Sequence, residues 1–467
     1  MIKKSIFITI CCLIGISLCA GVAVAAPSVK LDKSRDKVTK VTIQEKVTVE
    51  ILAEIKNEVK DASEITFVLE KIESNDDLTK ICEAFPDMNG LSLSQPKELT
   101  SIAPVAKLKG LTSINMYGGT VTDFSPLSDL TGLKSLEIRG YTGESGMLAP
   151  DLKWMSKLTN LTTLDIAAGR GKVPNLVSFE GIPSLPNLTR AKITFGAPTD
   201  LTPLQALSGL KVLSLEGSQI TDLSQLAGLT KLEELSLYGV TVKDFSPLAG
   251  CPSLKNLRVA TSKEADYSTL GKLSQVEILE TGYTVINDIS WITGMTSLKS
   301  LQVQKEKIAD YSPLAKLKLE SLRFWSMEAP VDLKQISGVV SLKNLRFDSQ
   351  KDVSGFEGLA SLVNLEDLYV RDMSAKEGTP VDMAFAKSLV NLKKLELQSS
   401  EVSANFDAVA NCIKLEEVVI SSSTTGITNF AVLMKLPNLA KLQVPKDTFT
   451  EEQLKGFANP NIKITQR

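Results

Sequence analysis

Histidine is absent from the 467 residues of this sequence. Its absence excludes Ser-His-Asp and Cys-His nucleophilic mechanisms and any metal centre ligated by histidine. Aromatic residues make up only 5% of the chain, and the formal net charge of −2 provides no basic excess for nucleic-acid binding. The hydrophobic fraction of 43% and the charged fraction of 23% are nevertheless those of a folded protein. We therefore expect no nucleic-acid partner, no metal and no cofactor.

Long apolar runs are also rare, and the main one lies at the start of the chain. It covers Ile6–Leu18, follows Lys3 and Lys4, and is too short to span a bilayer comfortably. The small residues Ala23–Ala25 then resemble a signal-peptidase site. Residues 1–25 are therefore predicted to be a signal peptide, and the mature protein to be periplasmic, secreted or attached to the cell surface, with no transmembrane segment.

Cys19 leaves an alternative open, because a lipoprotein signal would end at a cysteine. The residue before a lipidated cysteine is normally small, and Leu18 is not. This observation favours ordinary cleavage after Ala25.

The sequence has six cysteines, and three of them lie within the predicted signal peptide. The other three are Cys82, Cys251 and Cys412. Cys251 and Cys412 occupy equivalent places about seven repeats apart, roughly 35 Å at the spacing of strands, whereas a disulfide needs Cα atoms within about 7 Å. We expect three buried thiols with a structural role.

A repeated L-x-x-L-x-L motif dominates the rest of the chain. Between Leu188 and Leu298 the motif recurs every 22 residues five times in succession, and elsewhere the spacing is mostly 21 to 24 residues. The motif starts at Leu111, Leu133, Leu161, Leu188, Leu210, Leu232, Leu254, Val276, Leu298, Leu319, Leu342, Leu365, Leu392, Leu415 and Leu439.

An aspartate column has the same phase. Each member lies twelve residues after a motif start, and the members are Asp123, Asp200, Asp222, Asp244, Asp266, Asp288 and Asp310. Because these residues recur at one fixed position in seven units, we interpret them as caps of a turn and not as a carboxylate site.

Each repeat therefore reads as a short strand, a capped turn and a short helical segment. One such unit cannot bury its own leucines, so the units must stack. The predicted fold is an α/β solenoid: a right-handed superhelix with a parallel concave β-sheet and short 3-10, helical or irregular segments on the convex side.

The segment 232–250, with the sequence LEELSLYGVTVKDFSPLAG, resembles a bacterial internalin-type leucine-rich repeat. The resemblance covers about residues 85–467 and implies a binding protein. One departure is clear. The family usually has asparagine eight residues after the motif start, where this sequence has Gly119, Ser218, Val240, Ser262, Glu306 and Met327.

The expected domain organisation follows from these repeats. After the signal peptide we expect a flexible leader over 26–40, an N-terminal cap over 41–86, an array of about 15–16 repeats over 87–445 and a C-terminal cap over 446–467. Within the caps, 76–85 is predicted to be a helix, 47–59 is ambiguous between strand and helix, and 450–453 resembles a capping box.

Function is expected on the face of the sheet that does not carry the leucines. Side chains alternate along a strand, so positions two, four and six after each motif start point away from the core. Three consecutive repeats present there the residue types that dominate binding hot spots. These candidate partner-binding residues are Arg323, Trp325, Arg346, Asp348, Tyr369 and Arg371.

A secondary candidate lies nearer the N-terminus, where two adjacent long repeats place extra residues beside Tyr117, Arg139 and Tyr141.

The sequence thus predicts an exported, non-enzymatic protein that binds a macromolecule, most simply another protein, through its concave face. The alternatives are a cell-surface adhesin or glycan-binding module, which would use the same aromatic residues, and an enzyme, for which the repeats leave no room for a catalytic domain.

Overall fold

A computed structural model describes most of the chain beyond the predicted signal peptide. The described residues are 29–34, 37–59, 61–72, 74–94, 98–139, 152–167, 178–179, 182, 185–194, 199–217, 220–261, 265–284, 286–372, 381–402 and 404–467. They form two compact units: the described residues up to Thr221, with Gly228–Leu232, belong to the first, and Asp222–Ala227 with the described residues from Glu233 onward belong to the second. The predicted signal peptide, with Cys19, and Tyr141 of the secondary candidate lie outside the described residues.

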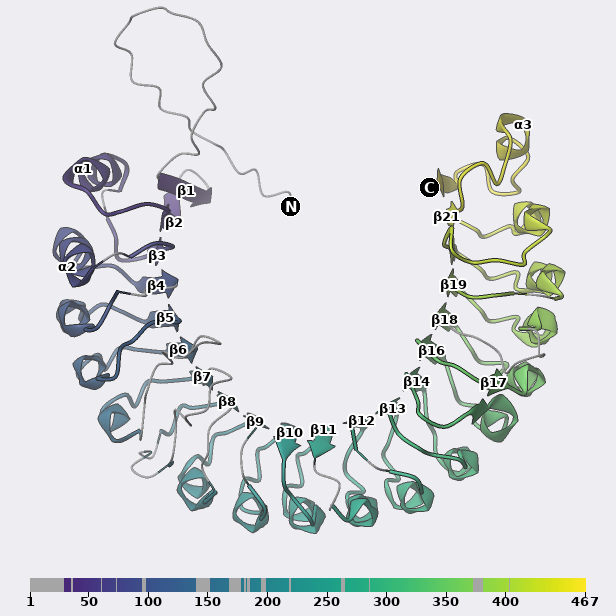
Figure 1. Cartoon of the computed structure of the whole chain (residues 1–467), viewed down its shortest axis with the longest axis horizontal. Coiled ribbons are helices and arrows are strands. Elements are labelled where there is room, and N and C mark those ends of the chain that lie inside the picture. Colours follow the sequence, from purple (N-terminus) through teal and green to yellow (C-terminus); the bar gives the residue numbers. More distant parts are fainter. Residues whose placement is uncertain are drawn as a thin grey trace, which may run out of the picture. The chain divides into compact units, whose positions relative to one another are not determined.

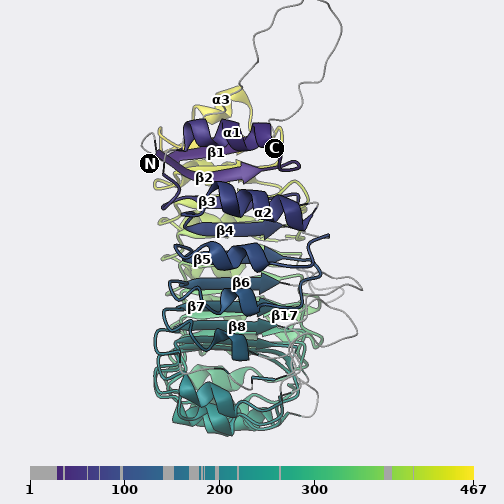
Figure 2. The same ribbon diagram turned by 90° about the vertical axis from the view of Figure 1, so that its left-hand side faces the viewer.

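The first unit is a stack of strands with helices on the side of the leucines (Figures 1 and 2). Its first two strands pair antiparallel and the rest are parallel. The strands are β1 (Val29–Ser34), β2 (Lys37–Ile43), β3 (Thr66–Leu69), β4 (Gly90–Ser94), β5 (Ser113–Tyr117), β6 (Ser135–Arg139), β7 (Thr163–Ala167), β8 (Arg190–Thr194) and β9 (Val212–Glu216). The helices are α1 (Val49–Glu58), α2 (Asn75–Ala84) and the 3-10 segments η1 (Ala103–Lys107), η2 (Ser125–Leu127), η3 (Lys153–Met155) and η4 (Thr202–Ala206).

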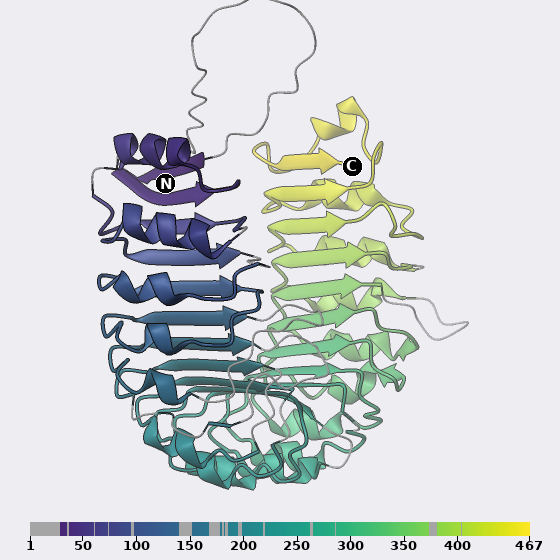
Figure 3. The same ribbon diagram turned by 60° about the vertical axis from the view of Figure 1, so that its left-hand side comes forward.

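The second unit repeats this arrangement with parallel strands throughout, and Figure 3 shows them stacked like rungs. The strands are β10 (Glu234–Val240), β11 (Asn256–Thr261), β12 (Ile278–Gly282), β13 (Ser300–Gln304), β14 (Ser321–Trp325), β16 (Asn344–Asp348), β18 (Asp367–Arg371), β19 (Lys394–Gln398), β20 (Glu417–Ile420), β21 (Lys441–Val444) and β22 (Lys463–Gln466), with a separate pair β15 (Val331–Asp332) and β17 (Val353–Ser354).

Short 3-10 segments cover the leucine side of the second unit, and a one-turn α-helix lies near its end. The segments are η5 (Ser224–Leu226), η6 (Ser246–Gly250), η7 (Tyr267–Lys272), η8 (Ser290–Gly294), η9 (Ser312–Lys316), η10 (Leu333–Ile336), η11 (Phe356–Ser361), η12 (Met383–Ser388), η13 (Phe406–Asn411) and η14 (Phe430–Lys435), followed by α3 (Glu451–Leu454). This strand-and-turn alternation confirms the predicted solenoid. No helix among the described residues is long and apolar enough to cross a membrane.

The aspartate column caps turns as predicted. In all seven repeats the Oδ1 atom accepts a hydrogen bond from the backbone N–H two residues later, at 2.8–3.0 Å. These bonds satisfy an amide that the short segment cannot pair internally. They fix the point at which each chain turns away from the sheet.

The leucines of each repeat are buried between its neighbours. Leu232, Leu235, Leu237 and Leu248 are at most 2% exposed, and each such side chain contributes roughly 2 kcal/mol through burial. Cys251, three residues after Leu248, is also fully buried.

The three described cysteines are unpaired and buried, as predicted. Burial raises the pKa of the Cys82 and Cys412 thiols to about 12 and that of Cys251 to about 11. Low thiolate content makes them poor nucleophiles, which agrees with a structural role.

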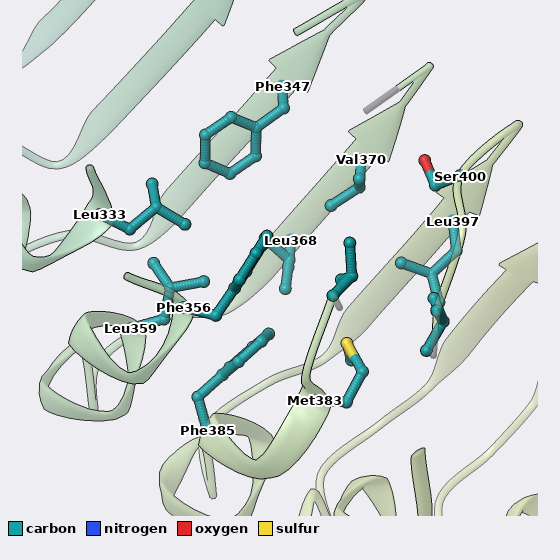
Figure 4. A pocket seen from close by; sticks show the side chains of 12 residues that line it. Leu333, Phe347, Phe356, Leu359, Leu368, Val370, Met383, Phe385, Leu397 and Ser400 are labelled. Atoms are coloured by element: carbon teal, nitrogen blue, oxygen red, sulfur yellow. The ribbon is translucent and has the colours of Figure 1, made fainter. Parts of the chain in front are cut away.

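Packing in the second unit leaves almost no internal space. Figure 4 shows one part of the core, where Phe347, Phe356 and Phe385 from successive repeats surround a void of about 10 Å³. A void of this size holds at most one water molecule, so the core offers no ligand cavity there.

The N-terminal segment differs from the expectation. The predicted flexible leader over 26–40 is wrong where the structure describes it, because β1 and β2 form an antiparallel hairpin whose second strand pairs with β3. Val41 and Ile43 of β2 are fully buried, so the hairpin extends the sheet and covers the first repeat.

The two cap helices and the capping box agree with the sequence. The ambiguous segment is helix α1 and the predicted helix is α2, each capped by a side chain. The Thr450 side chain accepts from the Gln453 backbone and the Gln453 side chain from the Thr450 backbone, which completes the predicted box.

A charged ladder along one rim of the second unit was not predicted. The residue after each motif start alternates in charge through nine consecutive repeats: Glu233, Lys255, Glu277, Lys299, Glu320, Lys343, Glu366, Lys393 and Glu416. Ion pairs of 2.6–3.0 Å join Glu277 to both of its lysine neighbours, Lys343 to Glu320, and Lys393 to Glu366. Each exposed pair contributes well under 1 kcal/mol, but together they penalise any slip of one repeat against the next.

Glu306 occupies the place where the resembled family has asparagine. It is fully buried, and its Oε2 accepts from Thr284 Oγ1 at 2.6 Å and from the Ile286 N–H at 3.1 Å. Its Oε1 and the hydroxyl of Tyr311 are buried with no hydrogen-bond partner among the described residues. Burial raises the pKa of Glu306 to about 7.

We expect the titration of the Glu306 carboxyl group to make the free energy of unfolding depend on pH. Because its folded pKa lies above the ordinary value near 4.5, its contribution is complete below that value and is lost as the pH rises through 7. Glu306→Gln should match wild type at pH 4 and exceed it at pH 8 by on the order of 3 kcal/mol in urea unfolding. A stability difference between the two proteins that does not change with pH would contradict this assignment.

Candidate functional site

The predicted partner-binding residues lie on three neighbouring strands of the second unit, β14, β16 and β18 (Figure 1). Backbone register places Arg323, Arg346 and Tyr369 in one row across the strands. The next row consists of Trp325, Asp348 and Arg371. We call these six residues the arginine cluster and the side of the sheet that carries them the open face.

Asp348 lies at the centre of the arginine cluster and is fully buried. Its Oδ2 is 2.7 Å from Arg323 Nε and 2.6 Å from Arg346 Nε. Its Oδ1 is 3.1 Å from Arg346 Nη2 and 3.2 Å from Arg371 Nη2. One carboxylate thus holds three guanidinium groups. Burial alone would raise the pKa of Asp348, but the hydrogen bonds from Arg346 and Arg323 outweigh it and lower the pKa.

The aromatic rings complete this arrangement. The guanidinium carbon of Arg323 is 4.7 Å from the centre of the Trp325 ring, and that of Arg346 is 3.8 Å from the centre of the Tyr369 ring. Both distances are those of cation–π pairs. The three arginine side chains remain 27–41% exposed, so they are fixed in place and still reach solvent.

Two shallow hollows adjoin the cluster on the open face. One has a volume of about 340 Å³, and its lining includes Arg323, Arg346, Tyr369 and Glu396. The other, of about 170 Å³, lies towards β10 and shares Trp325 with the cluster. Acidic and basic side chains line the larger hollow together, among them Glu280, Asp367 and Lys394. No group of three or more potential metal ligands occurs among the described residues.

Comparison with known proteins identifies the architecture. The chain matches no family model and no curated protein sequence. Among solved structures, the leucine-rich-repeat protein LIC12759 of Leptospira interrogans covers 90% of this chain and 99% of its own, with a TM-score of 0.53 and 17% identity. The internalin InlF of Listeria monocytogenes covers 80% of this chain and 95% of its own, with a TM-score of 0.43 and 22% identity.

The fold is that of a leucine-rich-repeat protein. The leucine-rich-repeat solenoid predicted from the sequence is therefore confirmed.

One predicted contact residue of this leucine-rich-repeat protein has a different role. Asp348 was expected to face a partner, but its full burial leaves no surface for contact. It is a positioning residue that orients the arginines. Its sequence position alone could not reveal this, because the burial arises from arginines on three separate strands.

The secondary candidate is partly assembled in the first unit. Tyr117 and Arg139 are register partners on β5 and β6, and the Tyr117 hydroxyl donates to Glu137 at 2.7 Å. Burial is the larger cause and this hydrogen bond the second, and together they raise the pKa of Tyr117 to about 12. Arg139 binds Glu137 at 2.6 Å and Asp165 at 2.7 Å. Here two acids surround one arginine, so the local charge is opposite to that of the arginine cluster.

Two exposed tyrosines were missed by the sequence analysis. Tyr238 stands six residues after its motif start, at an outward position, but is not among the candidate residues, and Tyr283 stands seven residues after its motif start, a position not counted as outward. They are 43% and 50% exposed, and their ring centres lie 6.5 Å apart. The sequence signal that could have revealed them is a row across the strands in which the small residues Ala260 and Gly282 follow Tyr238, and Gln304 then precedes Trp325.

We expect Asp348→Asn to destabilise the second unit. The variant keeps the shape but leaves three arginines without their shared charge, at a cost of about 2–3 kcal/mol near neutral pH in chemical unfolding. Because the folded pKa is lowered, the loss should shrink as the pH falls through that pKa. Asp372→Asn is the matched control, since Asp372 is half exposed and 3.9 Å from Arg371. Equal stabilities of the two variants at pH 7 would refute a central role for Asp348.

Proposed function

We propose that this leucine-rich-repeat protein is an exported, non-enzymatic binding protein that recognises a protein partner through the open face of its second unit. The observation that carries the proposal is the arginine cluster, in which one buried carboxylate and two rings hold three partly exposed guanidinium groups. Arginine, tryptophan and tyrosine are the residues enriched at binding hot spots. Because the contacts are fixed before binding, little side-chain entropy is lost on association.

A protein surface suits the arginine cluster better than a glycan does. A sugar ring binds aromatic side chains through their open faces, but Arg323 already covers one face of Trp325 and Arg346 one face of Tyr369. Guanidinium groups beside rings instead match the mixed apolar and carboxylate groups of a protein surface. The adhesin or glycan-binding alternative remains the competing outcome of the test.

Partner capture tests the proposal directly. The immobilised protein should retain a partner from its native surroundings, identified by mass spectrometry, and purified partner should then bind with a measurable Kd. Trp325→Ala combined with Tyr369→Ala should weaken that Kd at least tenfold, because two ring contacts of about 1 kcal/mol or more each are lost. Neither change touches Asp348 directly, so thermal stability should change little.

The control is Val363→Ala, which removes an exposed apolar side chain away from the open face. It should bind like wild type. Unchanged binding by the double variant would exclude the arginine cluster, and binding only of glycans on an array would support the alternative.

Export has its own test. N-terminal sequencing of the mature protein should begin at Ala26, since cleavage is predicted after Ala25. Labelling with radioactive palmitate should give no signal in wild type. A labelled protein whose label disappears in Cys19→Ser would establish the lipoprotein alternative instead.

A further inference from the structure

The smaller hollow on the open face is a formed pocket that the repeat pattern does not require. Its volume is about 170 Å³, and it lies across strands β10 to β14. Tyr238, Tyr283 and Trp325 contribute rings to its lining, whereas Ala260 and Gly282 contribute little or no side chain. These two small residues leave space beside Tyr238, and the Gln304 side chain closes the hollow between Gly282 and Trp325.

Tyr283 adopts a backbone conformation that an aromatic residue normally avoids. Its φ is +58°, in the left-handed region. Elsewhere in the same column the residues with positive φ are small or polar, namely Gly118, Gly217, Gly239, Lys305, Ser326, Ser349, Asp372 and Ser399. The conformation costs a bulky residue about 1 kcal/mol or more relative to glycine. Lys305 Nζ and the Tyr238 ring lie 4.7 Å and 6.5 Å from the centre of its ring, and the ring stays half exposed on the open face. An aromatic side chain held at the surface in this conformation points to a binding role.

The polar side chains around the hollow are already engaged with one another. Glu280 accepts from Arg258 at 2.7 Å, and Gln302 accepts from Arg323 at 3.0 Å. Gln304 Nε2 donates to the Tyr283 hydroxyl at 3.2 Å. A sugar needs several hydrogen-bond partners for its hydroxyl groups. These side chains could provide them only by breaking the hydrogen bonds that they already make. Arg323 lies over the Trp325 ring and Lys305 over the Tyr283 ring, each at 4.7 Å. Tyr238 and Tyr283 nevertheless remain 43% and 50% exposed, and this accessible ring surface favours an apolar group.

We propose that this pocket binds one aromatic or large aliphatic side chain of the protein partner. The inference rests on the proposed function and adds the anchor that the arginine cluster lacks. Trp325 belongs to both surfaces. Gly282 and Asp348 lie three strand spacings apart in register, roughly 14 Å, so one partner of ordinary size covers both. A buried anchor beside charged groups is the usual arrangement of a binding hot spot.

Single-residue probes test the pocket without knowledge of the partner. The full-length protein, labelled with 5-fluorotryptophan, contains three tryptophans, so its ¹⁹F spectrum is simple, and Trp325→Phe assigns the relevant signal. N-acetyl-phenylalanine amide and N-acetyl-leucine amide should shift that signal saturably, with a Kd in the millimolar range. N-acetyl-alanine amide and methyl β-glucoside should not. A saturable shift with the glucoside alone, or no shift with any probe, would overturn the proposal.

Two variants separate binding from folding. Ala260→Leu places bulk in the hollow and should weaken binding of the phenylalanine amide at least tenfold, whereas Val363→Leu adds bulk outside the open face and should have no effect. Tyr283→Gly removes one ring and relieves the positive φ, so it should weaken binding at least fivefold while thermal stability stays equal or rises. Unchanged binding by Ala260→Leu and Tyr283→Gly would refute the pocket.

The outcomes for the pocket and for the proposed function are distinguishable. The probe assay needs no partner, so its failure would remove the anchor and leave the partner-capture result as it stands. Probe binding that persists in a protein that captures no partner would instead overturn the proposed function.

Discussion

The structure depends on one constraint: no repeat can bury its leucines without a neighbour on each side. Leu322 and Leu345, which are register partners on paired strands of the second unit, are at most 1% exposed, so the register between repeats is as important as the fold of any one of them. The aspartate caps and the charged ladder act on this same register, the first by fixing where each turn begins and the second by matching charge across the rim. The N-terminal hairpin extends the constraint to the first repeat by covering it.

A stack held in this way leaves the open face free to vary, because side chains there do not contribute to the core. On the open face of the second unit, the buried Asp348 carboxylate binds three arginines, and a pocket that contains the small residues Ala260 and Gly282 lies beside them. Asp348 belongs to the sheet surface by sequence position but to the interior by burial, since arginines from three strands surround it. Rigid repeats thus convert a row of ordinary strand positions into an organised electrostatic group.

Much of the fold followed from the sequence because the signals repeat. The leucine columns, the aspartate caps and the capping box at Thr450 were each visible as fixed spacings. The hairpin β1–β2 was not predicted. The lysine-rich composition of this segment indicated a flexible leader, although Val41 and Ile43 already show the alternation of a strand. For the open face, the alternation rule correctly grouped Trp325 with the arginines in one region. It could not foresee the burial of Asp348 or the exposure of Tyr283, since the first depends on partners across strands and the second on a left-handed turn.

The alternating ladder has a consequence for how such an array changes length. Loss of one repeat between Glu233 and Glu416 would bring two like charges together at the junction, while loss of two adjacent repeats would restore a lysine facing a glutamate. The same rule applies to duplication: a copy of one repeat would place like charges together, whereas a copy of two adjacent repeats would keep the alternation. The rim therefore makes a pair of repeats, and not a single one, the natural unit of insertion and deletion in this part of the protein.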